Sequence, residues 1–128
     1  MTENLVAVLQ ELIDAAPGAD AYHLRLADDC VERELGTEEV DELFADFQRD
    51  FEQAVALVTE AWGAPAYSGA VDSDGFPSWS EALMLAYWQR DRILAFISLR
   101  HDDYHEPMFL EIGALTNDEV ATLLYTKP

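Results

Sequence analysis

The segment 70–81, AVDSDGFPSWSE, contains the residues of this chain whose types and spacing come nearest to a known metal site. Asp72, Asp74 and Glu81 fall at positions 3, 5 and 12 of a calcium-binding EF-hand loop. The first position, where such loops carry an anchoring aspartate, is Ala70, and the residues that follow predict a strand in place of an exiting helix. An Asp/Gly turn in a solvated loop is therefore favoured over calcium binding.

A second candidate is the loop 101–106, HDDYHE, which gathers two of the three histidines of the chain with three carboxylates. His101, Asp103 and His105 could bind a divalent metal or perform acid/base chemistry. A catalytic metal would need a further ligand from elsewhere, and His23 is the remaining histidine. A polar hairpin loop is the favoured interpretation, and the sequence favours a role other than catalysis, without a cofactor.

Acidic residues also recur at helical spacing. Glu42, Asp46 and Asp50 are like charges at i, i+4 and i+8, a spacing that destabilises a helix, and Arg49 is the nearby cation in the sequence. Such a surface is compatible with a complementary basic partner, although a charge run is usually just a solvated face. Trp79, between two serines in a Pro/Gly-containing loop, is a further candidate contact for a partner.

Charge and composition restrict the partners and the compartment. The chain has 26 acidic residues against 7 Lys and Arg, which gives a formal net charge of −19 over 128 residues. Nucleic-acid phosphates and anionic membranes would be repelled, so any partner should be basic. The single cysteine excludes an internal disulfide, and the acidic N-terminal segment is unlike a signal peptide, so we expect a cytoplasmic protein. Adaptation to high salt would also produce this acidity.

Apolar periodicity predicts the helices of a single domain, 1–128. A first helix is expected at about 3–16 and a long one at about 38–62, where three phenylalanines share one stripe and would cover a sheet. Segment 19–35 fits both a strand and a helix, and the helix is favoured. Thr116 to Glu119 matches a capping box, which predicts a last helix at about 117–125 with Val120, Leu123 and Leu124 facing inward.

The strands are expected in the second half of the chain. Apolar runs predict an antiparallel meander with strands at about 82–89, 92–100 and 107–113, and 66–71 is a candidate fourth strand at the edge. Ile93 to Leu99 is apolar on both faces, as expected for a central strand or an interface. The predicted fold is thus α+β, with N-terminal helices packed on a three- to four-stranded meander and a short C-terminal helix.

In size, charge and lack of a catalytic motif, the chain resembles bacterial immunity or inhibitor proteins, which neutralise a basic toxin or nuclease. This resemblance implies a small acidic binding protein that occupies a basic partner. One alternative is a dimeric module similar to a secretion chaperone, which would form a homodimer through the sheet. The other is a metal-binding protein or enzyme built around the 101–106 loop.

Overall fold

The computed structural model of the chain describes residues 5–18, 20–27, 36–77, 80, 82–101 and 107–126. The elements follow one another in the order α1 (Leu5–Ala15), β1 (Tyr22–Ala27), α3 (Thr37–Trp62), β2 (Tyr67–Ala70), β3 (Met84–Arg90), β4 (Ile93–Arg100), β5 (Met108–Thr116) and α4 (Asn117–Thr126). The α+β prediction is confirmed, including the long helix, the three-stranded meander β3–β4–β5 and the candidate fourth strand. None of the described helices is both long and apolar enough to cross a membrane.

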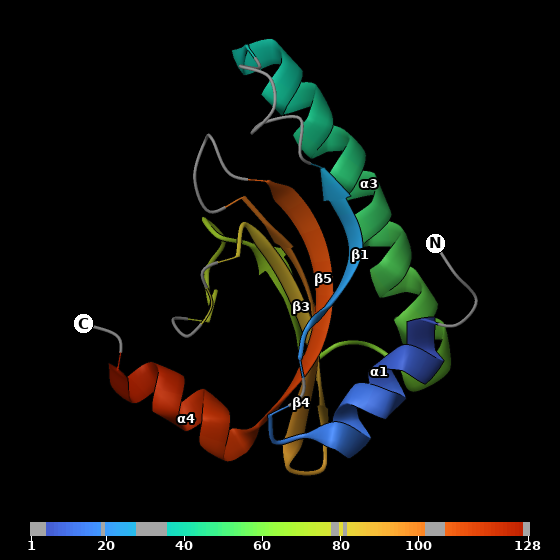
Figure 1. Cartoon of the computed structure of the whole chain (residues 1–128), viewed down its shortest axis with the longest axis vertical. Helices are drawn as coiled ribbons and strands as arrows, with labels where there is room; N and C mark the ends of the chain where they lie inside the picture. Colours follow the sequence, from blue (N-terminus) through green and yellow to red (C-terminus); the bar gives the residue numbers. More distant parts are fainter. Residues whose placement is uncertain are drawn as a thin grey trace.

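The strands form one antiparallel sheet in the order β1-β5-β4-β3-β2. Strand β4 is therefore the central strand, as its two apolar faces predict. The sheet is curved, with α1 and α3 on its outer side and α4 extending from the opposite side (Figure 1). The sheet is larger than predicted because β1 adds a fifth strand next to β5, which places β5 inside the sheet.

The helical interpretation of segment 19–35 is wrong for Tyr22–Ala27, which form β1. The register against β5 shifts between His23 and Arg25, so this strand contains a bulge. Because of the bulge, Tyr22 pairs with Ile112 on the helix side of the sheet, whereas Leu26 pairs with Phe109 on the opposite side. The alternating apolar residues of this segment therefore do not all lie on one face of the sheet.

The main core lies between the outer face of the sheet and helices α1 and α3. Phe47 and Val58 of α3 and Leu9 of α1 are fully buried. They meet alternate side chains of the three internal strands. These strand residues are Ala86, Trp88, Ala95, Ile97, Leu99, Met108, Leu110, Ile112 and Ala114. The predicted role of the long helix as the main cover of the sheet is confirmed.

The two ends of α3 are fixed by local contacts. At its start the Glu39 side chain accepts a hydrogen bond from the Gly36 backbone N–H at 3.3 Å. At its end the Gly63 carbonyl accepts a hydrogen bond from the Trp88 indole at 2.9 Å, and Trp62 packs edge-on against Trp88 at 6.3 Å between ring centroids. These contacts join the last turn of the helix to β3.

Helix α4 begins with the predicted capping box. The Thr116 backbone N–H donates to the Glu119 carboxylate at 3.0 Å, and the Glu119 N–H donates to Thr116 Oγ1 at 3.1 Å. The predicted inward orientation of Leu123 is wrong, since 37% of this residue is exposed. The Leu124 side chain lies outside the described part of the chain. Helix α4 thus packs less closely on the sheet than its apolar spacing predicts.

The inner face of the sheet, opposite α1 and α3, carries an aromatic row. Tyr67, Tyr87 and Phe96 are cross-strand partners, and the next position in the row is Gly113. A Cβ at Gly113 would lie 2.5 Å from Phe96 Cζ, so the Phe96 ring occupies the space over this glycine. A glycine inside a strand here permits close packing of an aromatic ring.

This packing predicts the effect of Gly113→Ala. The added methyl group should displace the Phe96 ring and lower the free energy of unfolding by about 1–3 kcal/mol. In a Phe96→Ala background the clash is absent, and the same change should be neutral or stabilising, because alanine loses less backbone entropy than glycine. Urea denaturation of the four proteins of this double-mutant cycle measures the coupling. An equal cost of Gly113→Ala in both backgrounds would contradict the packing.

Candidate functional site

The predicted acidic row lies on the side of α3 that is turned toward β1. Glu42, Asp46 and Asp50 are one helical turn apart and therefore share one side of the helix. Glu42 is exposed, whereas Asp46 and Asp50 are half-buried. The row is close to the edge strand of the sheet, since both of these aspartates contact a residue of β1.

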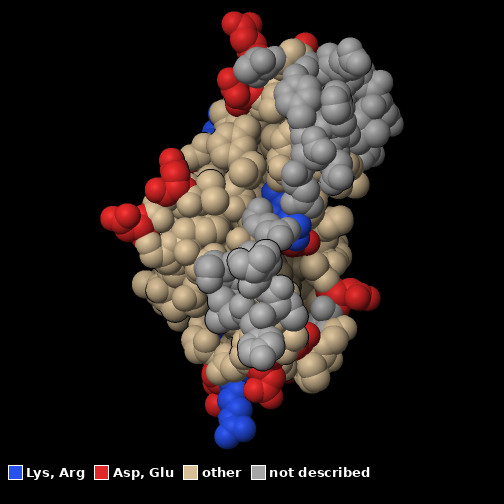
Figure 2. Space-filling view, turned by 90° about the vertical axis from the view of Figure 1, so that its left-hand side faces the viewer, with Lys and Arg blue, Asp and Glu red and all other residues tan. Residues whose placement is uncertain are grey.

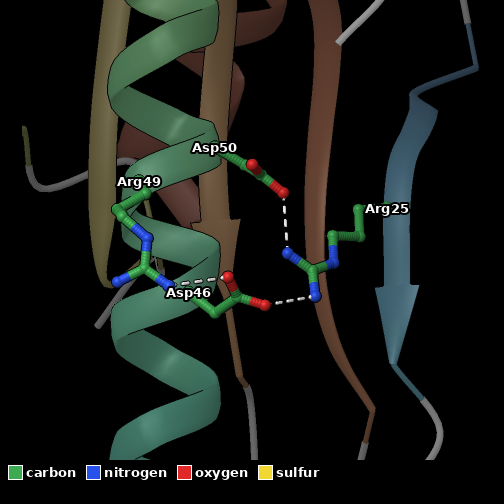
Figure 3. A network of polar contacts seen from close by, with 4 residues as sticks. All are labelled: Arg25, Asp46, Arg49 and Asp50. Atoms are coloured by element: carbon green, nitrogen blue, oxygen red, sulfur yellow. Dashed lines mark hydrogen bonds and ion pairs between the residues drawn. The ribbon is translucent and has the colours of Figure 1, made fainter.

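That residue is Arg25, whose guanidinium bridges β1 and α3 (Figure 3). Its Nη2 donates to Asp46 Oδ2 and its Nη1 donates to Asp50 Oδ2, both at 2.7 Å. The other oxygen of Asp46 accepts a hydrogen bond from Arg49 at 2.9 Å. Besides Arg49, the nearby cation in the sequence, Arg25 neutralises Asp46 and Asp50 across 21 and 25 residues of sequence.

The surroundings of Arg25 hold its charge in place. The guanidinium lies 4.1 Å from the centroid of the buried Phe47 ring, where a cation–π interaction adds to the two ion pairs. Burial lowers the pKa of Arg25, but hydrogen bonds and charge interactions with Asp46 and Asp50 outweigh this effect and raise it. The hydrogen bond from Arg25, followed by that from Arg49, lowers the pKa of Asp46. Arg25 and Asp46 therefore both remain charged over the physiological pH range.

The first turns of α3 carry a second group of acids. We call Glu38, Asp41 and Glu42 the acidic patch; all three are exposed. Within the described ranges, the ion pairs of α3 involve only Asp46 and Asp50, so no cation there neutralises the patch. A negative group near a helix N-terminus is favoured by the helix dipole, which allows these charges to coexist with an intact helix. The patch can attract a cationic surface.

The structure brings few of the predicted metal ligands together. Asp72 and Asp74 are exposed in the turn after β2, which is closed by a 2.9 Å hydrogen bond from the Ser73 N–H to the Ala70 carbonyl. His101 directly follows β4, and its Nε2 is buried and has no hydrogen-bond partner among the described residues.

The other candidates, Trp79, Glu81, Asp103 and His105, lie outside the described residues. In the part of the chain that is described, no group of three or more His, Cys, Asp or Glu side chains could hold a metal ion. The calcium and divalent-metal hypotheses therefore stay predictions.

Sequence reasoning missed a polar cluster on the inner face of the sheet, centred on Glu111 of β5. This glutamate is 8% exposed and pairs across the sheet with His23 on one side and Ser98 on the other. Ser98 Oγ donates to its Oε1 at 3.3 Å, and Arg100 lies 3.7 Å from the same oxygen. The sequence signal was a lone acid in the apolar run MFLEIG, which an alternating strand must turn toward the inner face.

The cluster surrounds a buried carboxylate with an arginine, a serine and a histidine. His23 Nε2 lies 3.8 Å from Glu111 Oε2, and its side chain is 48% exposed. The Phe109 ring lies 4.8 Å from the His23 ring and 5.5 Å from the Arg100 guanidinium. An unpaired carboxylate at this depth would be costly, so Arg100 and Ser98 stabilise it. The arrangement is sufficient for a structural ion pair between Glu111 and Arg100.

Comparisons with known proteins identify no relative: no family model, no curated protein and no solved structure matches the chain. The function must therefore be argued from the charges and surfaces described above.

The Arg25–Asp46 contact predicts a pH dependence. Because the pKa of Asp46 is lowered in the folded protein, its charge stabilises the fold above the ordinary aspartate pKa of about 3.9. This contribution is lost as the pH falls through the lowered pKa. Asp46→Asn should therefore reduce the melting temperature at neutral pH, and the difference from the parent protein should shrink toward about pH 2. Thermal unfolding, monitored by circular dichroism, measures this difference in melting temperature at each pH.

The matched control is Asp74→Asn, which removes an exposed carboxylate for which no ion pair within the described ranges is found. This variant should follow the parent protein at every pH. A melting-temperature difference for Asp46→Asn that stays constant from neutral to acidic pH would contradict the assigned ion pair.

Proposed function

We propose that this chain is a small acidic binding protein that occupies a basic protein partner, in the manner of bacterial immunity or inhibitor proteins. The observation that carries the proposal is the acidic patch of Glu38, Asp41 and Glu42, which is exposed and lacks a neutralising cation in the described ranges. The formal net charge of −19 extends the same preference to the whole molecule. We further propose a cytoplasmic location and no nucleic-acid partner.

The acids of α3 divide into two groups with different roles. Asp46 and Asp50 hold β1 on the helix through Arg25, so their charges are used within the protein. The acidic patch is not used in this way and lies in the first two turns of the same rigid helix. A fixed array of unpaired charges needs little reorganisation on binding, which favours association with a complementary surface.

Charge of this size acts mainly on the rate of association. Complementary charges steer the encounter of two proteins, and the effect weakens with salt because the Debye length is only about 8 Å at physiological ionic strength. Such steering benefits a protein that must bind a harmful partner quickly. The exposed carboxylates supply the attraction.

The inner face of the sheet is less acidic than the helix. In Figure 2, which looks at the side away from α1 and α3, most of the coloured Asp and Glu residues lie toward the outline of the molecule. In the described ranges the centre of this face carries Tyr87, Phe96 and the Glu111–Arg100 pair, where charge is balanced locally. The electrostatic attraction is therefore assigned to α3 and not to the sheet.

The proposal predicts the behaviour of the triple variant Glu38→Gln, Asp41→Asn and Glu42→Gln. When the tagged protein captures partners from a lysate of its own source cells, the parent protein should retain a defined basic partner. With that partner purified, the variant should bind more than about tenfold more slowly at low salt, because the steering charges are lost. Stopped-flow or surface-plasmon-resonance association rates at several salt concentrations measure the effect.

A matched control removes three exposed carboxylates elsewhere, with Glu11→Gln, Glu60→Gln and Asp74→Asn. Both variants carry the same net charge, so a specific role of the patch requires that the control associates much faster than the patch variant. Equal slowing in the two variants, or capture of no basic protein by the parent chain, would overturn the proposal.

A further inference from the structure

We propose that the free edge of β1 binds an extended segment of the basic partner as an added antiparallel or parallel strand. This inference rests on the proposed function, because it takes the same partner and names how the partner is held. The segment would alternate basic side chains, which face α3, with apolar side chains, which face the inner side of the sheet. Main-chain hydrogen bonds to β1 would provide the part of the binding energy that does not depend on the sequence of the segment.

The first observation is that β1 is an edge strand with exposed apolar side chains. It pairs with β5 on one side and is the terminal strand of the sheet within the described part of the chain. Tyr22 is 52% exposed and Leu26 is 49% exposed, although both are large apolar residues. An edge strand presents unpaired N–H and C=O groups, and exposed apolar side chains on it favour the addition of another strand.

The second observation is that the C-terminal half of β1 is weakly protected as an edge. The strand contains no lysine and no proline, and its arginine is directed toward α3 by the ion pairs with Asp46 and Asp50. The bulge between His23 and Arg25 disturbs only the first half of the strand. The regular part, from Arg25 to Ala27, is next to the carboxylates of α3.

The opposite edge of the sheet is a poorer template. Strand β2 has four residues, Tyr67–Ala70, and the chain turns directly after it. Val71 is 54% exposed there but lies in the turn, beyond the last ladder pair between Ala70 and Met84. The contrast between the edges assigns strand addition to β1 and supplies a matched position for a control.

The two sides of β1 determine the pattern of the added segment. Leu26 is on the inner side, where it pairs with Phe109, so an added apolar side chain would extend this row. Arg25 is on the outer side, beneath Asp46 and Asp50, whose side chains remain 44% and 31% exposed. An added residue on this side would meet carboxylates, and a lysine or arginine would complement them.

The acidic residues along α3 favour a basic segment as the added strand. In Figure 1, β1 runs beside α3 with its C-terminal end directed toward the N-terminal half of the helix, where the acidic patch lies. Glu42 is one turn before Asp46 on the same side of the helix and has no cationic partner among the described residues. A segment that continues beyond Ala27 would therefore approach the patch, which links strand addition to the proposed charge steering.

The test uses a ten-residue peptide of alternating lysine and valine as the probe, followed by fluorescence anisotropy and by amide hydrogen exchange of the full chain. The peptide should slow exchange of edge-facing amides in Tyr22–Ala27. Leu26→Lys should weaken peptide binding by at least about tenfold, because a lysine on the edge repels the basic strand and removes its apolar neighbour. Val71→Lys, which adds the same charge at a comparably exposed position, should change affinity by less than about twofold.

A second probe isolates the main-chain contribution. The same peptide with alternate backbone nitrogens methylated keeps its charge but loses the N–H groups along one edge, and it should bind much more weakly. Equal binding of the two peptides, equal effects of Leu26→Lys and Val71→Lys, or absence of protection in β1 would overturn the inference. A concentration-dependent dimer that Leu26→Lys abolishes, together with no peptide binding, would instead assign this edge to a second copy of the chain.

These outcomes are distinguishable from failure of the proposed function. If the acidic-patch variant associates slowly with the basic partner while β1 gains no protection, charge steering stands and strand addition fails. If β1 is protected by the peptide and the patch variant associates as fast as its control, the edge binds strands without the proposed steering.

Discussion

The central strand β4 must be covered on both of its faces, and the rest of the structure depends on this constraint. On the outer face Ala95, Ile97 and Leu99 are fully buried beneath α1 and α3. On the inner face Leu94 and Ser98 are also nearly inaccessible, at 4% and 3% exposure. An apolar strand covered in this way provides a rigid base, and the edge strands and the acidic helix are positioned relative to it.

On the inner face, the strands are covered by side chains of the sheet itself. Phe96 leans over Gly113, and Tyr67 stacks on Tyr87 at 6.0 Å between ring centroids. Beside this aromatic row, Glu111 is buried between Ser98 and His23, with Arg100 balancing its charge. A polar group at such a depth limits the register of β5 against its neighbours, because a shift of one residue would bury the carboxylate in the apolar core.

The sequence was sufficient for the parts of the fold that depend on local patterns. The long apolar stripe of α3, the capping box at Thr116 and the meander β3–β4–β5 each have a signal within a few residues, and all were predicted correctly. Strand β1 was not, because the alternation of Tyr22, Leu24 and Leu26 fits a strand while the spacing of Leu24 and Ala27 also fits a helix. Only pairing with β5, which is distant in the sequence, decides between the two conformations.

For the candidate site too, the local spacing could be predicted from the sequence, whereas the distant contact could not. The spacing of Glu42, Asp46 and Asp50 on one side of a helix is visible in the sequence, but the partner of the last two, Arg25, lies on another element. Its contact divides the acids into a structural pair and an unpaired patch, a distinction that charge counting cannot make. The same contact directs Arg25 away from the edge of β1. One ion-pair network therefore fixes the edge strand on α3, while the acidic patch has no cationic partner among the described residues.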